Sequence, residues 1–251
     1  MSTTRRGAPK PLFEPLVPQP AYGRVAAEIE QKILKRTLRP GDALPTETDL
    51  ASQFGVNRST VREALRRLES AGLVGREGGT KRLRVTRPGH AETASRVSRA
   101  LALDDVTFIE LWEAMLAVAP RTAALAASHV TPGTLARLEA AIGTVEAARA
   151  SEAAVGGVVE FFGTLAESSG NRVLMLAMQP VTRLLAPSLR RMIDRVPQGR
   201  SRIVVAQRCI LEALRKHDPV EAESWMTRHV QDFRRGYEIA GIALDTRVAE
   251  A

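Results

Sequence analysis

Arginine and hydroxyl side chains are concentrated in the stretch from Arg58 to Arg66. Arg58, Arg62 and Arg66 recur every four residues, so a helix would place them along one face. A guanidinium can bind guanine O6 and N7 as a fork in the major groove, and the hydroxyls of Ser59 and Thr60 can donate to phosphates. The spacing therefore predicts a helix that reads DNA bases. The alternative is that these arginines only solvate a surface helix.

Two helices and a tight turn are expected to present this face. Thr46 can cap a helix over Glu47–Phe54, with the carboxylate three residues later completing the cap. Gly55 supplies the turn, and Asn57 is the expected cap of the next helix, over Arg58–Ala71. The result is a helix-turn-helix, in which the start of the second helix reaches base edges.

A further helix and a hairpin would complete this unit. The helix is expected over residues 22–37, where four apolar residues recur at helical spacing and form one stripe: Val25, Ile29, Ile33 and Leu34. Two short strands are expected at residues 73–74 and 83–85. Between them lies a basic, glycine-containing tip that can approach DNA, with three candidate contacts: Gly78, Gly79 and Lys81. This pattern predicts a winged helix-turn-helix.

The positive charge is confined to the part of the chain that holds these elements. Residues 1–90 contain 17 Lys and Arg against 9 Asp and Glu, whereas residues 91–251 contain 19 of each. A basic head followed by a neutral body is typical of a chain whose head binds a polyanion such as DNA.

The composition indicates a globular protein of the reducing cytoplasm. Apolar residues make up 44% of the chain and charged residues 25%, which is ordinary for a globular protein. No apolar run approaches the roughly 20 residues of a transmembrane helix, and the N-terminus lacks the apolar stretch of a signal peptide. The one cysteine, Cys209, excludes a disulfide framework and a zinc site built from several cysteines.

The body of the chain is expected to be an all-α bundle. Beyond residue 87 the strand patterns stop, Ala and Leu dominate, and helical patterns predict seven helices, over residues 91–103, 107–127, 132–150, 153–169, 172–192, 201–217 and 219–244. The expected fold class is therefore mainly α, with four segments: an arm over 1–20, the winged helix-turn-helix over 21–87, a linker over 88–92 and the helical domain over 93–247.

The head resembles the winged helix-turn-helix of the GntR family of bacterial transcription regulators. The matching run is LRPGDALPTETDLASQFGVNRSTVREALRRLESAGLV, residues 38–74. The resemblance implies that Arg58, Arg62 and the wing tip at Gly78 and Gly79 contact the operator. Thr48 stands where the family usually has an arginine that also contacts DNA, so an altered contact is expected there.

The body resembles the FCD ligand-binding domain of FadR-type regulators in three segments: PRTAALAA (120–127), FFGTLAESSGN (161–171) and ILEALRKHDPVEAESWMTRH (210–229). Many such domains hold a divalent metal through one Asp and three His. By resemblance these four positions fall on Val158, Phe162, Gln207 and His229. Because one imidazole and one amide cannot make a metal site, no metal and no other cofactor are expected.

The same positions predict an apolar pocket. An Arg and a Glu that commonly line the family's pocket fall on Met115 and Ala119, so the charged and ligating groups at Val158, Phe162, Met115 and Ala119 are replaced by apolar side chains. Such a lining disfavours small carboxylates and favours an elongated apolar effector, with Gln207 and His229 as polar handles. A fatty acid, an acyl-CoA or a sterol-like lipid would fit. The alternatives are a collapsed cavity that binds nothing and a polar site that the resemblance misplaces.

The sequence therefore predicts a ligand-responsive transcription regulator and no enzyme, because the body shows no set of catalytic residues and no glycine-rich phosphate loop. The expected partners are operator DNA, an apolar effector and a second copy of the chain, without a membrane. A homodimer would bind a pseudo-palindromic operator and act as a repressor, the commoner mode in the family. The alternatives are a regulator without an effector, or one that responds to a metal or a carboxylate.

Overall fold

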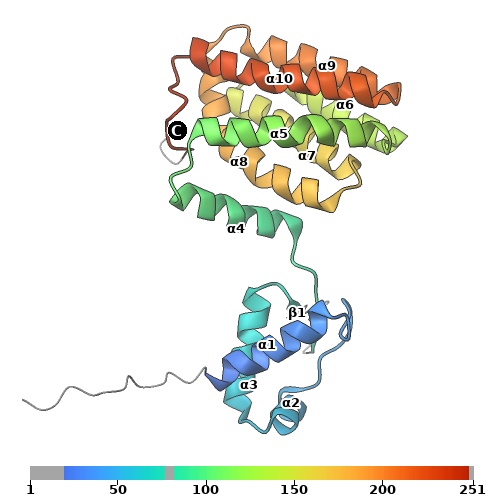
Figure 1. The fold of residues 1–251 in the computed structure, drawn as a ribbon, viewed down its shortest axis with the longest axis vertical. Helices are drawn as coiled ribbons and strands as arrows, with labels where there is room; N and C mark the ends of the chain where they lie inside the picture. The colour runs from blue at the N-terminus through green and yellow to red at the C-terminus, as the bar shows by residue number, and fades with distance from the viewer. Residues whose placement is uncertain (1–19, 77–81, 249–251) are drawn as a thin grey trace, which may run out of the picture. The chain divides into compact units, whose positions relative to one another are not determined.

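The computed structural model describes residues 20–76 and 82–248 of the chain. The chain forms two compact units, Met1–Gly89 and His90–Ala251. The first unit contains three helices and one antiparallel hairpin among its described residues (Figure 1): α1 (Ala21–Leu34), α2 (Glu47–Phe54), α3 (Arg58–Ser70), β1 (Val74–Arg76) and β2 (Leu83–Val85).

Local hydrogen bonds confirm the expected starts of α2 and α3. The Thr46 hydroxyl accepts from the backbone N–H of Asp49, and the Asp49 carboxylate accepts from the backbone N–H of Thr46, each at 3.2 Å. Gly55 adopts the left-handed conformation with φ of 63°, which only glycine adopts without a steric cost. Asn57 Oδ1 then accepts from the backbone N–H of Thr60 at 2.8 Å, so short polar side chains fix both helix starts.

The core of the first unit forms under α3. Val61, Leu65 and Leu68 are buried against α2 and α1, and their spacing leaves the opposite face of α3 exposed. The apolar stripe of α1 is shorter than expected, because Leu34 is 70% exposed. The helix ends at this residue, one position beyond Ile33, and a step of one residue turns a side chain by about 100° around the helix.

The first strand of the hairpin differs from its expected position. It comprises Val74–Arg76 rather than residues 73–74, and Val74 pairs with Val85. The backbone N–H of Leu73 bonds to the carbonyl of Leu68, so this group closes the end of α3 and is not available to the sheet.

The second unit is a helical bundle (Figure 1), which confirms the expected fold class. Its helices are α4 (His90–Leu103), α5 (Phe108–Ala127), α6 (Pro132–Ala147), α7 (Ser151–Ser168), α8 (Arg172–Arg195), α9 (Gly199–Arg215) and α10 (Pro219–Ile239). Residues 90–92, expected in the linker, lie in α4. No helix within the described ranges is long and apolar enough to cross a membrane.

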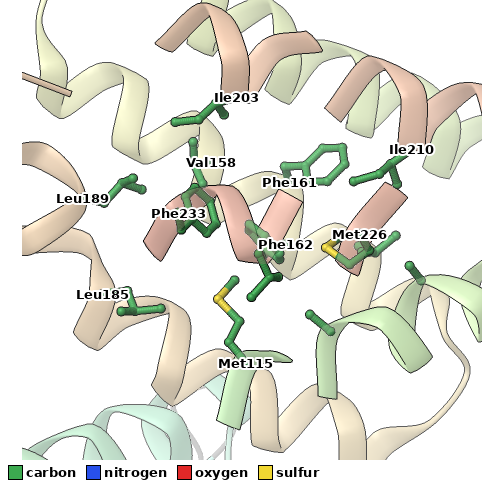
Figure 2. Packing of buried hydrophobic residues seen from close by; sticks show 14 of the residues in the cluster. Met115, Val158, Phe161, Phe162, Leu185, Leu189, Ile203, Ile210, Met226 and Phe233 are labelled. Atoms are coloured by element: carbon green, nitrogen blue, oxygen red, sulfur yellow. The ribbon is translucent and has the colours of Figure 1, made fainter. Parts of the chain in front are cut away.

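Close helix packing in the bundle depends on small residues. The helix pairs α5 with α10, α6 with α7 and α7 with α8 pack side by side. At Gly157 of α7, an added Cβ would lie 2.7 Å from the Val145 side chain and 2.9 Å from the Ala141 carbonyl of α6. Only a glycine lets these two backbones approach so closely. This contact positions α7 beside α6, and the residues that follow Gly157 on α7 include Val158 and Phe162, whose side chains lie in the interior of the bundle (Figure 2).

Candidate DNA-reading face and interior cavity

The exposed face of α3 carries the side chains that the sequence assigns to DNA. Arg58, Ser59, Arg62 and Arg66 are exposed, and Thr60 is half-buried. The opposite face of the helix packs into the core of the first unit. A single helix therefore presents these five groups on a rigid support.

Asn57 holds both hydroxyls that were expected to bind phosphate. Its Oδ1 atom accepts from Ser59 Oγ at 2.8 Å and from Thr60 Oγ1 at 2.7 Å, in addition to the Thr60 N–H. A hydroxyl has one proton to donate. Either side chain must therefore rotate away from Asn57 before it can donate to a phosphate.

The three arginines of this face have different environments. Arg62 donates from Nε and Nη2 to Glu47 Oε2, and Arg66 pairs with Glu63 at 2.8 Å. Arg58 has no hydrogen-bond or ion-pair partner within the described part of the chain. Arg58 is therefore the arginine of this face whose donors are all unoccupied.

Glu47 is a functional candidate that sequence reasoning missed. It is the first residue of α2, lies 15 positions before Arg62 and is half-buried. The one signal that pointed to it was its place in the LPTE run next to Thr48, which is exposed on α2. The wing candidates Gly78, Gly79 and Lys81 lie outside the described residues.

An apolar cavity of about 20 Å³ lies inside the helical bundle. Met115, Val158 and Phe162 line it, and Figure 2 shows these side chains projecting into the same interior region as Phe233. The remaining lining residues are Phe108, Trp112, Val159, Thr182, Leu185, Leu189 and Tyr237. A space of this size holds about one water molecule, and an apolar lining gives such a molecule few partners. The cavity therefore holds no elongated effector in this conformation.

His229 does not line this cavity, although its ring lies 4.6 Å from that of Phe233, which does. Its ring is nearly parallel to that of Phe162 at a centroid distance of 5.7 Å, and it lines two clefts of about 280 and 340 Å³ that also contain Arg202 and Asp232. Burial lowers the pKa of His229 from 6.5 to about 4, against a smaller opposing effect of the Asp232 carboxylate. The imidazole is therefore neutral at pH 7.

Gln207 and Ala119 are buried without exposed surface, and neither lines the apolar cavity. Both polar atoms of the Gln207 side chain, and Nε2 of His229, are buried without a hydrogen-bond partner within residues 20–76 and 82–248. Leaving such atoms unpaired costs about 1–3 kcal/mol for each group. The structure thus separates the two expected polar handles from the cavity that Met115, Val158 and Phe162 line.

The residues at the family's metal positions do not fit a divalent ion. Val158 and Phe162 offer only carbon, which leaves Gln207 and His229 as donors, and a site needs about four N, O or S ligands. Within residues 20–76 and 82–248 no group of three or more His, Cys, Asp or Glu side chains is placed to hold one.

Comparisons with known proteins agree with this geometry. Residues 21–80 match the family model described as bacterial regulatory proteins, gntR family, and residues 110–232 match the FCD domain. The chain is 34% identical over 167 residues to the uncharacterized HTH-type transcriptional regulator Rv0494 of Mycobacterium tuberculosis (strain ATCC 25618 / H37Rv), which covers 66% of this chain and 68% of that protein.

Two further matches extend over most of the chain. The HTH-type transcriptional repressor NanR of Escherichia coli (strain K12) is 29% identical over 222 residues, which cover 86% of this chain and 84% of NanR. A solved structure described as Streptococcus agalactiae GntR has 27% identity and a TM-score of 0.58, and the match covers 85% of this chain and 99% of that one.

Proposed function

Because the chain belongs to the GntR family of bacterial regulatory proteins, we propose that two copies bind one pseudo-palindromic operator. Members of this family with an FCD effector-binding domain are DNA-binding transcription regulators, and this chain is such a regulator and not an enzyme. The observation that carries this proposal is the exposed face of α3, where the Arg58 side chain has no partner among the residues that the structure describes. Two such faces related by a twofold axis would read two half-sites of matching symmetry. Arg58 and Arg62 then contact bases, while Ser59, Thr60, Arg66 and the wing contact the backbone.

We infer that the regulator represses transcription in the cytoplasm. NanR, which the match covers over 84% of its length, is named a transcriptional repressor. A bound dimer that occupies promoter DNA blocks access to it, and an effector that binds the operator-free state better releases the dimer. Thr48 stands where the family usually has an arginine, and it supplies no positive charge. In this proposal α3 and the wing therefore carry most of the operator contacts.

We propose that the effector is an elongated, largely apolar molecule such as a fatty acid, an acyl-CoA or a sterol-like lipid. The support is the lining of the interior cavity. Met115, Val158 and Phe162 place apolar side chains there, at positions where the FCD domains that the chain resembles carry charged or metal-binding side chains. A small carboxylate in this space would lose its hydration without a compensating partner. The cavity of about 20 Å³ must widen to admit such a ligand, and the flexible Met115 side chain can move.

An operator selected from a random DNA pool tests both parts of the proposal. The full-length chain should retain a sequence with inverted half-sites and bind it as a dimer in sedimentation analysis. Addition of an effector should then weaken the complex in a gel-shift titration. Three classes of compound are compared: fatty acids and acyl-CoA, small dicarboxylates, and divalent metals. Release by the second or third class alone would contradict the apolar effector, while selection of no sequence would contradict operator binding.

A further inference from the structure

A second space in the helical bundle adjoins the apolar cavity. It is a cleft of about 300 Å³ between α4, α7 and α8, and its lining includes Ala91, Gly163 and Arg183, one from each helix. This volume reaches the lower end of the range for small-molecule sites, about 300–1,000 Å³. The cleft is therefore large enough to hold a ligand that the cavity of about 20 Å³ cannot hold.

The cleft and the cavity share part of their lining. Val159, Phe162 and Thr182 line both spaces, so these three side chains form the partition between them. The Thr182 hydroxyl donates to the Met178 carbonyl at 2.9 Å, which leaves its methyl group to the partition. A hydrocarbon chain that displaces Phe162 would pass from the cleft into the apolar interior without meeting a charge.

The polar groups of the cleft suit a ligand with an anionic head. Two carboxylates, Glu160 and Glu167, line it, and both accept hydrogen bonds from Arg137, at 3.0 and 2.8 Å. These three groups keep one net negative charge, which the Arg183 guanidinium on the cleft lining balances. Arg183 is exposed and has no ion-pair partner among the described residues. Gln179 also lines the cleft, and its buried Oε1 has no hydrogen-bond partner in the described part of the chain. Half a turn of that amide would present its NH₂ group to an acceptor.

We propose that this cleft is the effector's entry and head-group site, and that it takes a single-chain carboxylic acid. The carboxylate would pair with Arg183 and the Gln179 amide, and the chain would extend past Phe162 into the apolar cavity. The inference rests on the proposed effector class and adds the position and chemistry of the head. A guanidinium that pairs with a carboxylate gains from charge as well as hydrogen bonding.

The position of the cleft beside α4 gives such a ligand a route to the DNA-binding unit. Ala91 lies in the first turn of α4, which begins directly after Gly89, the last residue of the first unit. Only Ala94 is buried among the fourteen residues of α4, all of which are described. A helix with so little burial is held weakly, so contacts with a bound chain would change its stability and that of the connection to the first unit.

Two glycines of α7 supply a matched pair of variants. Gly163 lines the cleft and Gly156 does not, and a Cβ added at either meets no atom within 4 Å. Gly163→Leu should place an apolar side chain in the cleft, and Gly156→Leu is the control with the same change on the same helix. Both should keep the helical circular dichroism of the wild type. Arg183→Gln removes the head-group charge at an exposed position and serves as a second, independent variant.

The experiment measures binding of decanoate, decanol and decylamine to the full-length protein by calorimetry. Decanoate should bind the wild type and Gly156→Leu equally, and Gly163→Leu at least ten-fold more weakly. Arg183→Gln should weaken decanoate several-fold and leave decanol unchanged. Equal affinities for the two leucine variants, or a preference of the wild type for decylamine, would overturn the proposed site.

Operator affinity, measured with and without decanoate on a selected operator, distinguishes a failure of this inference from a failure of the proposed function. If decanoate binds as expected but leaves operator affinity unchanged, the binding site stands and its regulatory role fails. If decanoate does not bind while another compound releases the operator, the regulator stands and the inferred cleft is wrong. The second result would direct attention to the clefts beside His229.

Discussion

Arg62 of α3 donates two hydrogen bonds to a single carboxylate oxygen of Glu47, from Nε at 3.3 Å and from Nη2 at 3.1 Å. The two residues lie on different helices of the first unit, so the pair ties the recognition helix to the start of α2. The pair uses Nε and Nη2 and leaves Nη1 of Arg62 without a bond to Glu47, and it restricts the rotation of the guanidinium. We expect Glu47 to keep Arg62 from moving to a DNA phosphate.

Glu47→Gln is expected to lower the specificity of DNA binding. The variant should bind non-specific DNA more tightly, and the slope of log K against log salt should steepen by about one unit, because Arg62 becomes able to neutralise a phosphate. The ratio of operator to non-specific affinity should fall. Glu63→Gln, which releases Arg66 instead, is the control. An equal fall in the ratio of operator to non-specific affinity in both variants would contradict a positioning role of Glu47.

Arg58→Ala is expected to abolish specific operator binding while the dimer stays intact. A bidentate guanine contact contributes about 1–3 kcal/mol of base discrimination. Arg58 is exposed and pairs with no other described side chain, so its loss should not disturb the fold. The measurement is a nuclease footprint on the selected operator, with sedimentation to follow the dimer. Arg190→Ala, an exposed arginine of the second unit, controls for loss of positive charge. An unchanged footprint would exclude Arg58 from base recognition.

His229 is expected to make stability depend on pH between about 6.5 and 4. Burial lowers its pKa in the folded chain to about 4, whereas the unfolded chain takes up this proton near pH 6.5. Stability is therefore full above pH 6.5 and is lost as the pH falls toward 4, by at most about 3 kcal/mol. Urea unfolding of the wild type and His229→Leu across this range tests it. The wild type should lose stability relative to His229→Leu as the pH falls from 6.5 to 4, and parallel curves would contradict the assignment.

Gln207→Leu is expected to stabilise the second unit by about 1 kcal/mol or more, because it replaces two buried polar atoms that have no partner among the described residues by apolar ones. The matched control is Ser188→Ala. The Ser188 hydroxyl is also buried, but it lies 3.0 Å from the Tyr237 hydroxyl and bonds to the Leu185 carbonyl, so its removal should destabilise. In thermal unfolding, the midpoint temperature should rise for Gln207→Leu and fall for Ser188→Ala. A loss of stability in Gln207→Leu would indicate a bound water or ligand that satisfies the amide.

Purified protein is expected to contain no stoichiometric divalent ion held by His229. The donors near the family's metal positions are one amide and one imidazole, which are too few and carry no charge. Elemental analysis of the wild type and of His229→Ala checks this expectation. One metal per chain that is lost in the variant would overturn the apolar interpretation of the cavity.

The sequence by itself determined the features that depend on local chemistry. The starts of α2 and α3 follow from Thr46, Asp49 and Asn57, whose side chains bond to backbone groups three residues away. Gly55 permits the turn between the two helices through its own backbone angle. Such signals act over one helical turn, so the printed residues suffice to place them.

Only the tertiary structure decided which side chains meet across the fold. The pair between Arg62 and Glu47 joins residues 15 positions apart, and no local rule links them. The six residues expected around one pocket are divided, since Met115, Val158 and Phe162 line a cavity of about 20 Å³ while His229 faces separate clefts. Close packing in three dimensions sets the volume of a cavity and its neighbours, and helical periodicity specifies only that a residue points inward.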